Sequence, residues 1–409
     1  MLGCGRMTSA SLVSLRAVGP SLGVMLAIQS VGSVGAASIA VLAPAIAPVA
    51  GVAPSTIGLY TMLLFACGML SALIGGALVP RFGPVRVCQA SLLMGVAGLG
   101  LALSGHVAGL ALCAVIMGLG MGAPSPASSH LLFRVTPPKV ISTVMSIKQT
   151  GVPLGGALAG AILPALTLMW DWRGALIAVA AATLLSALTI QLWRRDMDND
   201  RDPARPVNLP GLWGGMGLIW REPNLRLIAL AAAILSAGQI SISAFYVTYL
   251  VEIGLSLTAA GFALAVAQLS GVAGRVIWGG VADWSGRPLM VLAGLSVVAA
   301  LGTLAVTRYA IDWPPIAILA VSVVLGASTI GWAGVVYGEV ARRAPAGRTA
   351  EASGGATAFM FAGIVIGPAF FTAIVRIAGS FTAAYAVMAV AIAAIAAAML
   401  WRLSQGGAR

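Results

Sequence analysis

Long runs of apolar residues separated by short polar breaks dominate the pattern along the chain. Each run holds about 20 residues, enough for a helix to cross a hydrocarbon core of about 30 Å. The sequence lacks the alternation with period two, in stretches of about ten residues, that a membrane-spanning β-barrel needs. The pattern therefore predicts an all-α membrane protein with twelve transmembrane helices, at 17–42, 54–79, 87–104, 108–132, 141–166, 174–193, 226–250, 258–282, 288–307, 314–337, 352–375 and 380–401.

The first run, 17–42, follows Arg6 and Arg16 and so begins like a secretory signal peptide. It is longer than the apolar core of such a peptide, and further runs of the same kind follow it. We therefore expect it to be retained as the first membrane span, whether translation starts at Met1 or at Met7.

The longest polar stretch, 194–223, separates the first six runs from the last six. It begins "RRDMDNDRDPARPVNLP", with charges of both signs and three prolines, and ends near "GLWGGMGLIW", which is typical of a short interfacial helix. We expect an N-terminal six-helix bundle at 1–193, a linker at 194–225 and a C-terminal six-helix bundle at 226–409.

The composition agrees with a membrane location, and the distribution of basic residues predicts how the chain is oriented in the membrane. The chain is 60% hydrophobic and only 8% charged, with a mean hydropathy of +1.01 and a net charge of +12. All but five of its 23 basic residues fall on the side of the linker; Arg173, Arg308 and Arg376 fall on the other side, and Lys148 and Arg275 lie inside spans. The positive-inside rule then places the linker and both termini in the cytoplasm. The basic charge therefore indicates a multi-pass protein of the cell (inner) membrane rather than a nucleic-acid partner.

The two halves share sequence features. "GGALVPRFGPVR" (75–86) follows the second run and "GGVADWSGRP" (279–288) follows the eighth, while "GVPLGGALAG" (151–160) in the fifth resembles "GIVIGPAFF" (363–371) in the eleventh. These pairs indicate one six-helix fold repeated. With six plus six helices and a central linker, the chain resembles the major facilitator superfamily, whose loop motif is Gly-x-x-x-Asp-Arg/Lys-x-Gly-Arg/Lys. The second copy matches at Gly279, Asp283, Gly286 and Arg287, with Trp284 replacing a basic residue; the first matches at Gly76, Arg81 and Gly83, with Pro80 in place of the aspartate.

The resemblance implies that these loop residues form a conformational latch that stabilises an outward-facing state. Glycines let neighbouring helices approach closely, and Asp283 can pair with a basic group or with the N-terminus of a facing helix. A simpler interpretation is that Asp283 and Arg287 only end one helix and follow the positive-inside rule.

The most informative charges are those inside the membrane. Arg275 lies eight residues before Asp283 and Lys148 nine residues after Lys139, which puts both about 12 to 13 Å into the bilayer. Such a cation costs at least about 2.5 kcal/mol and usually faces a watery cavity. We found no acidic residue at this depth in the sequence, so we expect an anionic ligand to supply the counter-charge, although snorkelling remains the simpler alternative for Arg275. Arg275, four residues before Gly279, also resembles the substrate-carboxylate arginine of monocarboxylate and oxalate/formate-type carriers.

Polar residues at helical spacing supply further candidates for substrate contacts. Gln29 and Ser33 share a face of the first run, Gln239, Ser243 and Tyr246 share a face of the seventh, and Gln268 lies two turns before Arg275. In the superfamily the first and seventh helices line the central cavity. Equally, such residues can form hydrogen bonds between helices without touching a ligand.

The sequence thus favours a secondary transporter of a small organic anion, a carboxylate, working by alternating access as a monomer in the lipid bilayer. Exchange of anions and co-transport of a proton are both open. The competing hypothesis is efflux of drugs or lipophiles, in which Arg275 and Lys148 are structural. We expect no enzyme activity, metal or cofactor, because no nucleophile with a base, phosphate loop or metal-ligand spacing appears, and Cys4, Cys67, Cys88 and Cys113 suit packing.

Overall fold

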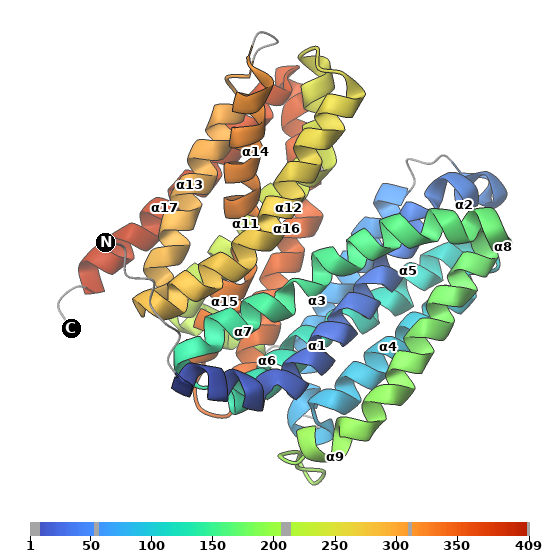
Figure 1. Ribbon diagram of the computed structural model, residues 1–409, viewed down its shortest axis with the longest axis vertical. Coiled ribbons are helices and arrows are strands. Elements are labelled where there is room, and N and C mark those ends of the chain that lie inside the picture. Colours follow the sequence, from blue (N-terminus) through green and yellow to red (C-terminus); the bar gives the residue numbers. More distant parts are fainter. Residues whose placement is uncertain (1–8, 53–56, 206–213, 310–312, 407–409) are drawn as a thin grey trace.

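The computed structural model describes residues 9–52, 57–205, 214–309 and 313–406, and every regular element in these ranges is a helix (Figure 1). This confirms the predicted all-α class. The N-terminal half contains α1 (Ser9–Val41), α2 (Ala43–Ala50), α3 (Ile57–Phe82), α4 (Pro84–Ala102), α5 (Val107–Met121), α6 (Pro124–Val135), η2 (Pro138–Val140), α7 (Ile141–Gln149), α8 (Gly151–Thr189), η3 (Ile190–Trp193) and α9 (Arg194–Met197). The C-terminal half contains α10 (Gly214–Arg221), α11 (Pro223–Glu252), α12 (Leu257–Ser285), α13 (Pro288–Val306), α14 (Pro315–Thr329), α15 (Ala333–Arg343), α16 (Thr349–Ala378) and α17 (Phe381–Gly406).

Eleven stretches of the described chain are long and apolar enough to cross a membrane. One of them, Pro138–Met197, has 60 residues and as a single straight helix would extend about 90 Å, about three times the hydrocarbon thickness. The backbone of α8 is non-helical at Trp170 and at Asp171, where φ is 63°. The predicted runs 141–166 and 174–193 lie on either side of this break. The count of twelve spans and the cytoplasmic termini stay predictions.

Three predicted spans are interrupted where the apolar pattern runs on without a gap. The run 108–132 divides at Gly122 and Ala123, just before Pro124, and the run 314–337 divides between Thr329 and Ala333. The run 141–166 divides at Thr150, three residues before Pro153. Because an interrupted helix leaves backbone carbonyls without their usual donors, these positions can accept hydrogen bonds from side chains.

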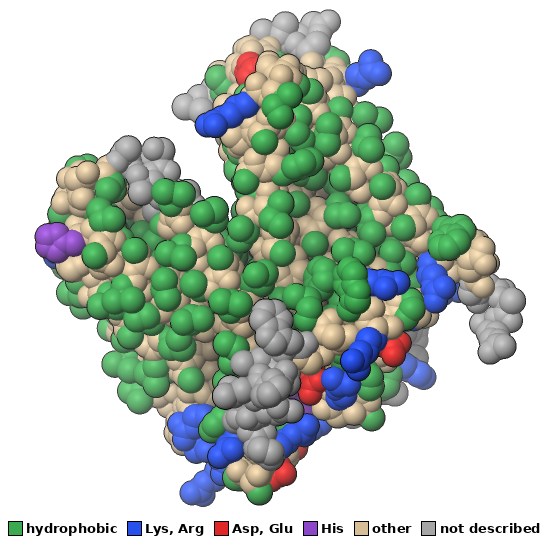
Figure 2. Space-filling view, turned by 180° about the vertical axis from the view of Figure 1, so that it is seen from behind, with side chains coloured by type: hydrophobic (Ala, Val, Ile, Leu, Met, Phe, Trp, Pro, Cys, Tyr) green, Lys and Arg blue, Asp and Glu red, His purple; other side chains and the backbone are tan. Residues whose placement is uncertain are grey.

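The two halves meet at one end of the molecule and diverge at the other (Figure 1). We call the end that carries α9 and the α12–α13 connection the linker end, and the opposite one the open end. Figure 2 shows the surface hollowed between the halves at the open end, whereas most basic side chains visible on that face gather toward the linker end. The larger buried apolar cluster contains residues from both halves, including Met145 and Val336. Packing thus joins the halves at the linker end.

Two motif glycines let the halves approach closely there. In α3, a Cβ on Gly76 would lie 2.9 Å from the carbonyl oxygen of Ala350 in α16. In α12, a Cβ on Gly279 would lie 2.7 Å from Cβ of Ser146 and 2.8 Å from the carbonyl oxygen of Ser142, both in α7. These distances leave no room for a side chain, so both glycines are needed for the observed contact between the halves.

We expect Gly279→Ala to destabilise the closed linker end by about 1 to 3 kcal/mol, because the added methyl group overlaps α7. The adjacent Gly280→Ala is a matched control, since nothing lies within 4 Å of the Cβ it would add. The apparent melting temperature of each purified variant measures the effect. Equal melting temperatures for the two variants would show that the contact at Gly279 contributes little.

Candidate functional site

Arg275 in α12 is 3% exposed and binds backbone atoms of both halves. Its Nε donates to the carbonyl oxygen of Ile330 at 3.1 Å, and its Nη1 donates to the carbonyl oxygen of Gln149 at 2.5 Å. The oxygen of Gln149 lacks its normal helical donor because residue 153, four positions on, is a proline without an N–H. The oxygen of Ile330 is free because the helix is interrupted between α14 and α15. Arg275 therefore joins two helix interruptions across the halves.

Lys148 lies beside the same residue. Its side chain is 2% exposed, and its Nζ donates to Oε1 of Gln149 at 2.9 Å and lies 5.7 Å from the ring centre of Tyr337. The two predicted cations thus come together at Gln149, one at its carbonyl group and the other at its side-chain amide. Neither of them forms an ion pair with a carboxylate in the part of the chain that the structure describes.

Both cations keep donors for a further ligand. A guanidinium group has five N–H donors and an ammonium group has three. Within the described residues, Arg275 makes two hydrogen bonds and Lys148 makes one. A carboxylate placed between them would accept several charge-assisted hydrogen bonds and would neutralise part of the buried positive charge.

Gln29 lies close to this site, and Ser33 lies one turn further along α1. The Cβ atom of Gln29 would be 2.9 Å from a Cβ added to Gly151, so it packs directly against the α7–α8 interruption. Its Oε1 is buried and has no hydrogen-bond partner among the described residues. Gln29 and Ser33 line a small cavity of about 50 Å³ inside the N-terminal half. An unpaired carbonyl oxygen at this position has the capacity to bind a water molecule or a ligand donor.

The other predicted residues of the seventh and eighth runs form no hydrogen bond with the two cations in the part of the chain that the structure describes. Gln268 donates to Oγ of Ser243 at 3.4 Å, which links α12 to α11, and Ser243 donates to the carbonyl oxygen of Gln239 within α11. Tyr246 is fully buried, with its hydroxyl bonded to those of Tyr309 at 2.9 Å and Ser322 at 2.8 Å. The structure therefore places Tyr246 in the interior of the C-terminal half and does not bring it to the cations.

Asp283 caps a helix of the other half. Its carboxylate accepts hydrogen bonds from the backbone N–H groups of Ser142 at 3.0 Å and Thr143 at 2.7 Å, in the first turn of α7. The residue preceding α7 is Val140, whose side chain has no oxygen and cannot cap it. Arg342 of α15 donates to the same carboxylate at 2.5 Å. Asp283 thus contacts both kinds of partner considered for it, a basic group and a helix N-terminus.

The loop after α3, where Pro80 replaces the aspartate of the motif, has an acid from elsewhere in the chain. Oδ1 of Asp198 accepts from the backbone N–H of Val85 at 2.7 Å, and Oδ2 accepts from that of Arg86 at 3.2 Å, so Asp198 caps α4. Gly83, whose φ is 88°, packs directly against this carboxylate and leaves no room there for a Cβ atom. Burial raises the pKa of Asp198, and the two backbone hydrogen bonds offset that rise in part.

The linker also binds α6. Oδ2 of Asp200 lies 2.7 Å from Nε2 of His130, and Oδ1 pairs with Arg134. Burial alone would raise the pKa of Asp200, but its hydrogen bonds with His130 and Arg134 and the positive charge of Arg134 lower that pKa below its ordinary value. Arg81 donates to the carbonyl oxygen of Arg205 at 3.1 Å. His130 and Arg81 therefore hold the linker against the N-terminal half.

The remaining motif residues shape the connection between α12 and α13. Gly286 has φ of 62° and ends α12 in the left-handed conformation that glycine adopts most easily. Arg287 follows as the residue before α13, and its side chain has no ion pair in the described part of the chain. Gly76 and Gly279 supply the close contacts between the halves described above.

Sequence analysis missed Gln149, Arg342 and Asp198, which complete these contacts. The sequence does contain a signal for Gln149: Pro153, four positions later, has no backbone N–H to donate to the carbonyl oxygen of Gln149. Gly83 and Val140, the residues before α4 and α7, have no side-chain oxygen that can cap a helix. Their sequence therefore indicated that acids from elsewhere, here Asp198 and Asp283, would cap these two helices. Arg342 was counted only among the basic residues of the linker side, and nothing local indicated its partner.

Comparisons with known proteins agree on one family. The sequence profile described as Major Facilitator Superfamily matches residues 22–354. The 3-(3-hydroxy-phenyl)propionate transporter of Escherichia coli (strain K12) is 30% identical over 131 residues, 30% of this chain and 32% of that protein. The 4-hydroxybenzoate transporter PcaK of Pseudomonas putida is 28% identical over 158 residues, 38% of this chain and 35% of that protein. The matched segments span between about a third and about half of the curated relatives.

A solved structure extends the likeness to the whole fold. The MFS transporter FucP in the outward conformation superposes with a TM-score of 0.75, at 14% identity, over 93% of this chain and 98% of that one. At this identity the likeness concerns the arrangement of helices alone.

We expect the pair of Asp283 and Arg342 to show a coupling energy of about 1 to 3 kcal/mol, because the carboxylate is nearly buried and its hydrogen bonds are charge-assisted. The variants Asp283→Asn, Arg342→Gln and the double variant form the cycle, measured as the free energy of unfolding in mixed micelles. Asp196→Asn, at an exposed position, is the control and should leave stability unchanged. Additive effects of the two substitutions would argue against the pair.

Proposed function

The chain belongs to the major facilitator superfamily, and from that premise we propose that it is a secondary transporter of a small organic anion, with a carboxylate as the substrate class. Transport proceeds by alternating access, in which the two halves close first at one end and then at the other. The observation that carries this proposal is the meeting of Lys148 and Arg275 at Gln149 without a carboxylate partner among the described residues.

The energetics of the two cations favour an anionic substrate. Each one costs at least about 2.5 kcal/mol inside a bilayer, and carbonyl or amide oxygens offset only part of that cost. A substrate carboxylate supplies the missing negative charge and can take two parallel hydrogen bonds from a guanidinium group. Gln149 accepts one hydrogen bond from each cation, so binding of a carboxylate would release Gln149 from at least one of them.

The relatives support the same substrate class. Two of the matched proteins are named as transporters of 3-(3-hydroxy-phenyl)propionate and 4-hydroxybenzoate, both of which are carboxylates. The identity is low and the matched segments are short, so these names support an organic acid in general and neither compound in particular.

The site also suits alternating access. Arg275 belongs to the C-terminal half and Gln149 to the N-terminal half, so their hydrogen bond crosses between the halves. With the linker end closed and the open end hollowed, a substrate can approach from the open end (Figure 2). Neutralisation of the two cations lowers the cost of enclosing them and so favours the occluded state that precedes opening at the linker end.

A second candidate is efflux of drugs or lipophilic compounds. One observation favours it: both hydrogen bonds of Arg275 go to backbone carbonyls at helix interruptions, which is a structural role. In that case the positive charge would be needed to hold the helices together and would not contact cargo.

The proposal includes the number of membrane spans and the side of the membrane on which the termini lie. The 60-residue stretch crosses the bilayer twice, turning at Trp170 and Asp171, so the chain has twelve spans in the cell (inner) membrane with the linker and both termini in the cytoplasm. A reporter enzyme that is active only in the cytoplasm should therefore be active when fused after Arg409 and inactive when inserted after Asp171. The opposite pattern would overturn this orientation.

We expect uptake of a labelled carboxylate into proteoliposomes to fall by about tenfold or more in Arg275→Lys and in Lys148→Ala, because each variant removes charge-assisted hydrogen bonds to the substrate. A panel of monocarboxylates and dicarboxylates identifies the substrate. Arg308→Gln is the control, since it removes a positive charge from an exposed position at the open end. Retained rates in both variants, or export of cationic dyes with carboxylates ignored, would favour efflux.

Gln149→Glu separates the two candidates more sharply within the same assay. The substitution keeps the size of the side chain and places a carboxylate beside Lys148, where it competes with the substrate for the positive charge. For an anion transporter the KM should rise by about tenfold while the protein remains folded. For an efflux transporter the new ion pair should leave cargo affinity unchanged.

A further inference from the structure

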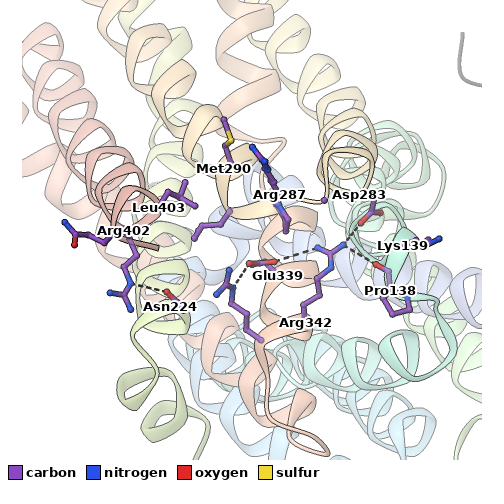
Figure 3. Close-up of a pocket in the computed structure, with 15 residues that line it drawn as sticks. Pro138, Lys139, Asn224, Asp283, Arg287, Met290, Glu339, Arg342, Arg402 and Leu403 are labelled. Carbon is purple, nitrogen blue, oxygen red and sulfur yellow. Dashed lines mark hydrogen bonds and ion pairs between the residues drawn. The ribbon is translucent and has the colours of Figure 1, made fainter. Parts of the chain in front are cut away.

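A large pocket at the linker end contains basic side chains that the proposed transport site does not use (Figure 3). Its volume is about 1180 Å³, and it lies among η2, the start of α11, the α12–α13 connection, α15 and the end of α17. Its charged lining residues are Lys139, Asp283, Arg287, Glu339, Arg342, Arg343 and Arg402.

The pocket carries an excess of positive charge. Glu339 is 3% exposed and pairs with Arg343, and Asp283 pairs with Arg342, so the two acids neutralise two of the five cations. Arg402 donates to the amide oxygen of Asn224 at 3.3 Å, a neutral partner. Among the described residues, the side chains of Lys139 and Arg287 form no ion pair. Three cations therefore remain without negative partners.

The lining points to a ligand that combines a phosphate with apolar parts. Arginine side chains match the geometry of phosphate oxygens, and lysine adds a compact positive charge. Leu289, Met290 and Leu403 supply an apolar wall beside these cations, and Met290 is 53% exposed. The volume far exceeds what a monatomic anion needs and is sufficient for a phosphodiester headgroup.

Residues of both halves form the pocket. Pro138 and Lys139 come from the N-terminal half, and the other lining residues come from the C-terminal half. Arg342 spans the boundary, because it donates to Oγ of Ser142 at 2.8 Å and to the carbonyl oxygen of Pro138 at 3.4 Å. Separation of the halves at this end would divide the cations between two surfaces.

We propose that this pocket binds a phosphate-bearing anion at Arg287, with Lys139 and Arg402 adding positive charge on either side of it (Figure 3), and that binding stabilises the conformation in which the linker end is closed. The phosphate belongs either to the headgroup of an anionic phospholipid in the adjacent leaflet or to a soluble phosphate monoester. Because positive side chains of both halves surround the ligand only when the halves are together, its affinity is higher for the closed linker end, and it shifts the equilibrium toward that state. The proposal does not depend on the identity of the transported substrate.

Native mass spectrometry of the purified full-length protein tests the binding. The protein is taken from vesicles of phosphatidylcholine and phosphatidylglycerol in equal amounts, and glycerol 1-phosphate is added separately as the soluble probe. We expect the double variant Lys139→Gln with Arg287→Gln to retain about tenfold less of the bound probe than the native protein. Arg308→Gln with Arg376→Gln, which removes two charges from the open end, should bind like the native protein.

The two probes distinguish the sources of the phosphate. Retention of phosphatidylglycerol assigns the pocket to a lipid headgroup, and binding of glycerol 1-phosphate alone assigns it to a soluble anion. Equal binding by the native protein and both double variants would overturn the proposal, as would failure of the native protein to bind either probe.

A distance measurement tests the conformational effect. Spin labels at Val107 and Ile316, two exposed positions at the open end of opposite halves, report how far that end opens. They are introduced with the native cysteines replaced by alanine. The bound probe should increase the population at long distance in the otherwise native protein and leave the Lys139→Gln, Arg287→Gln variant unchanged. The same distribution with and without probe in the native protein would contradict the stabilisation.

Discussion

A chain that spans a membrane must satisfy its backbone carbonyl groups inside the protein, because the hydrocarbon offers no hydrogen-bond donors. In this protein two helices are interrupted where the halves meet, at Thr150 and between Thr329 and Ala333. The carbonyl groups of Gln149 and Ile330 that these interruptions release both accept from Arg275. The guanidinium group of Arg275, although unfavourable in lipid, thus supplies hydrogen-bond donors that these two carbonyl groups need. The same contacts place Arg275 at Gln149, which Lys148 also binds.

The linker end follows a related rule, since helix N-termini there depend on acids supplied by distant segments. Asp198 caps α4 and Asp283 caps α7, in each case at a helix whose preceding residue has no side-chain oxygen. The two caps have different consequences. Asp198 holds the linker against the N-terminal half, whereas Asp283 connects the C-terminal half to the N-terminal half, so separation of the halves would break its hydrogen bonds. Asp198 therefore replaces, as a helix cap, the aspartate that is missing at Pro80, but among the described residues its hydrogen bonds and ion pair stay with the N-terminal half and the linker.

In the proposed alternating access, these contacts act in two separate regions of the protein. Gly76, Gly279 and Asp283 determine how closely the halves meet at the linker end, and Arg275 with Gln149 connects the halves beside the proposed substrate site. A ligand at either region changes the relative free energies of the open and closed arrangements only if it binds one of them better. The proposed substrate anion and the proposed phosphate-bearing ligand would therefore influence the same equilibrium through separate residues.

The sequence by itself determined the helical membrane class and the presence of two cations, Lys148 and Arg275, within apolar runs, because each depends on local composition and spacing. The apolar runs did not indicate where helices are interrupted within them, because a helix can break inside a bundle without a polar residue at the break. Only the tertiary structure decided that Lys148 and Arg275 share Gln149, that Tyr246 points into the interior of its half, and that Asp283 caps α7. These contacts join residues up to about 140 positions apart, and their proximity follows from the packing of the two halves, so no pattern in either segment alone identifies the partner.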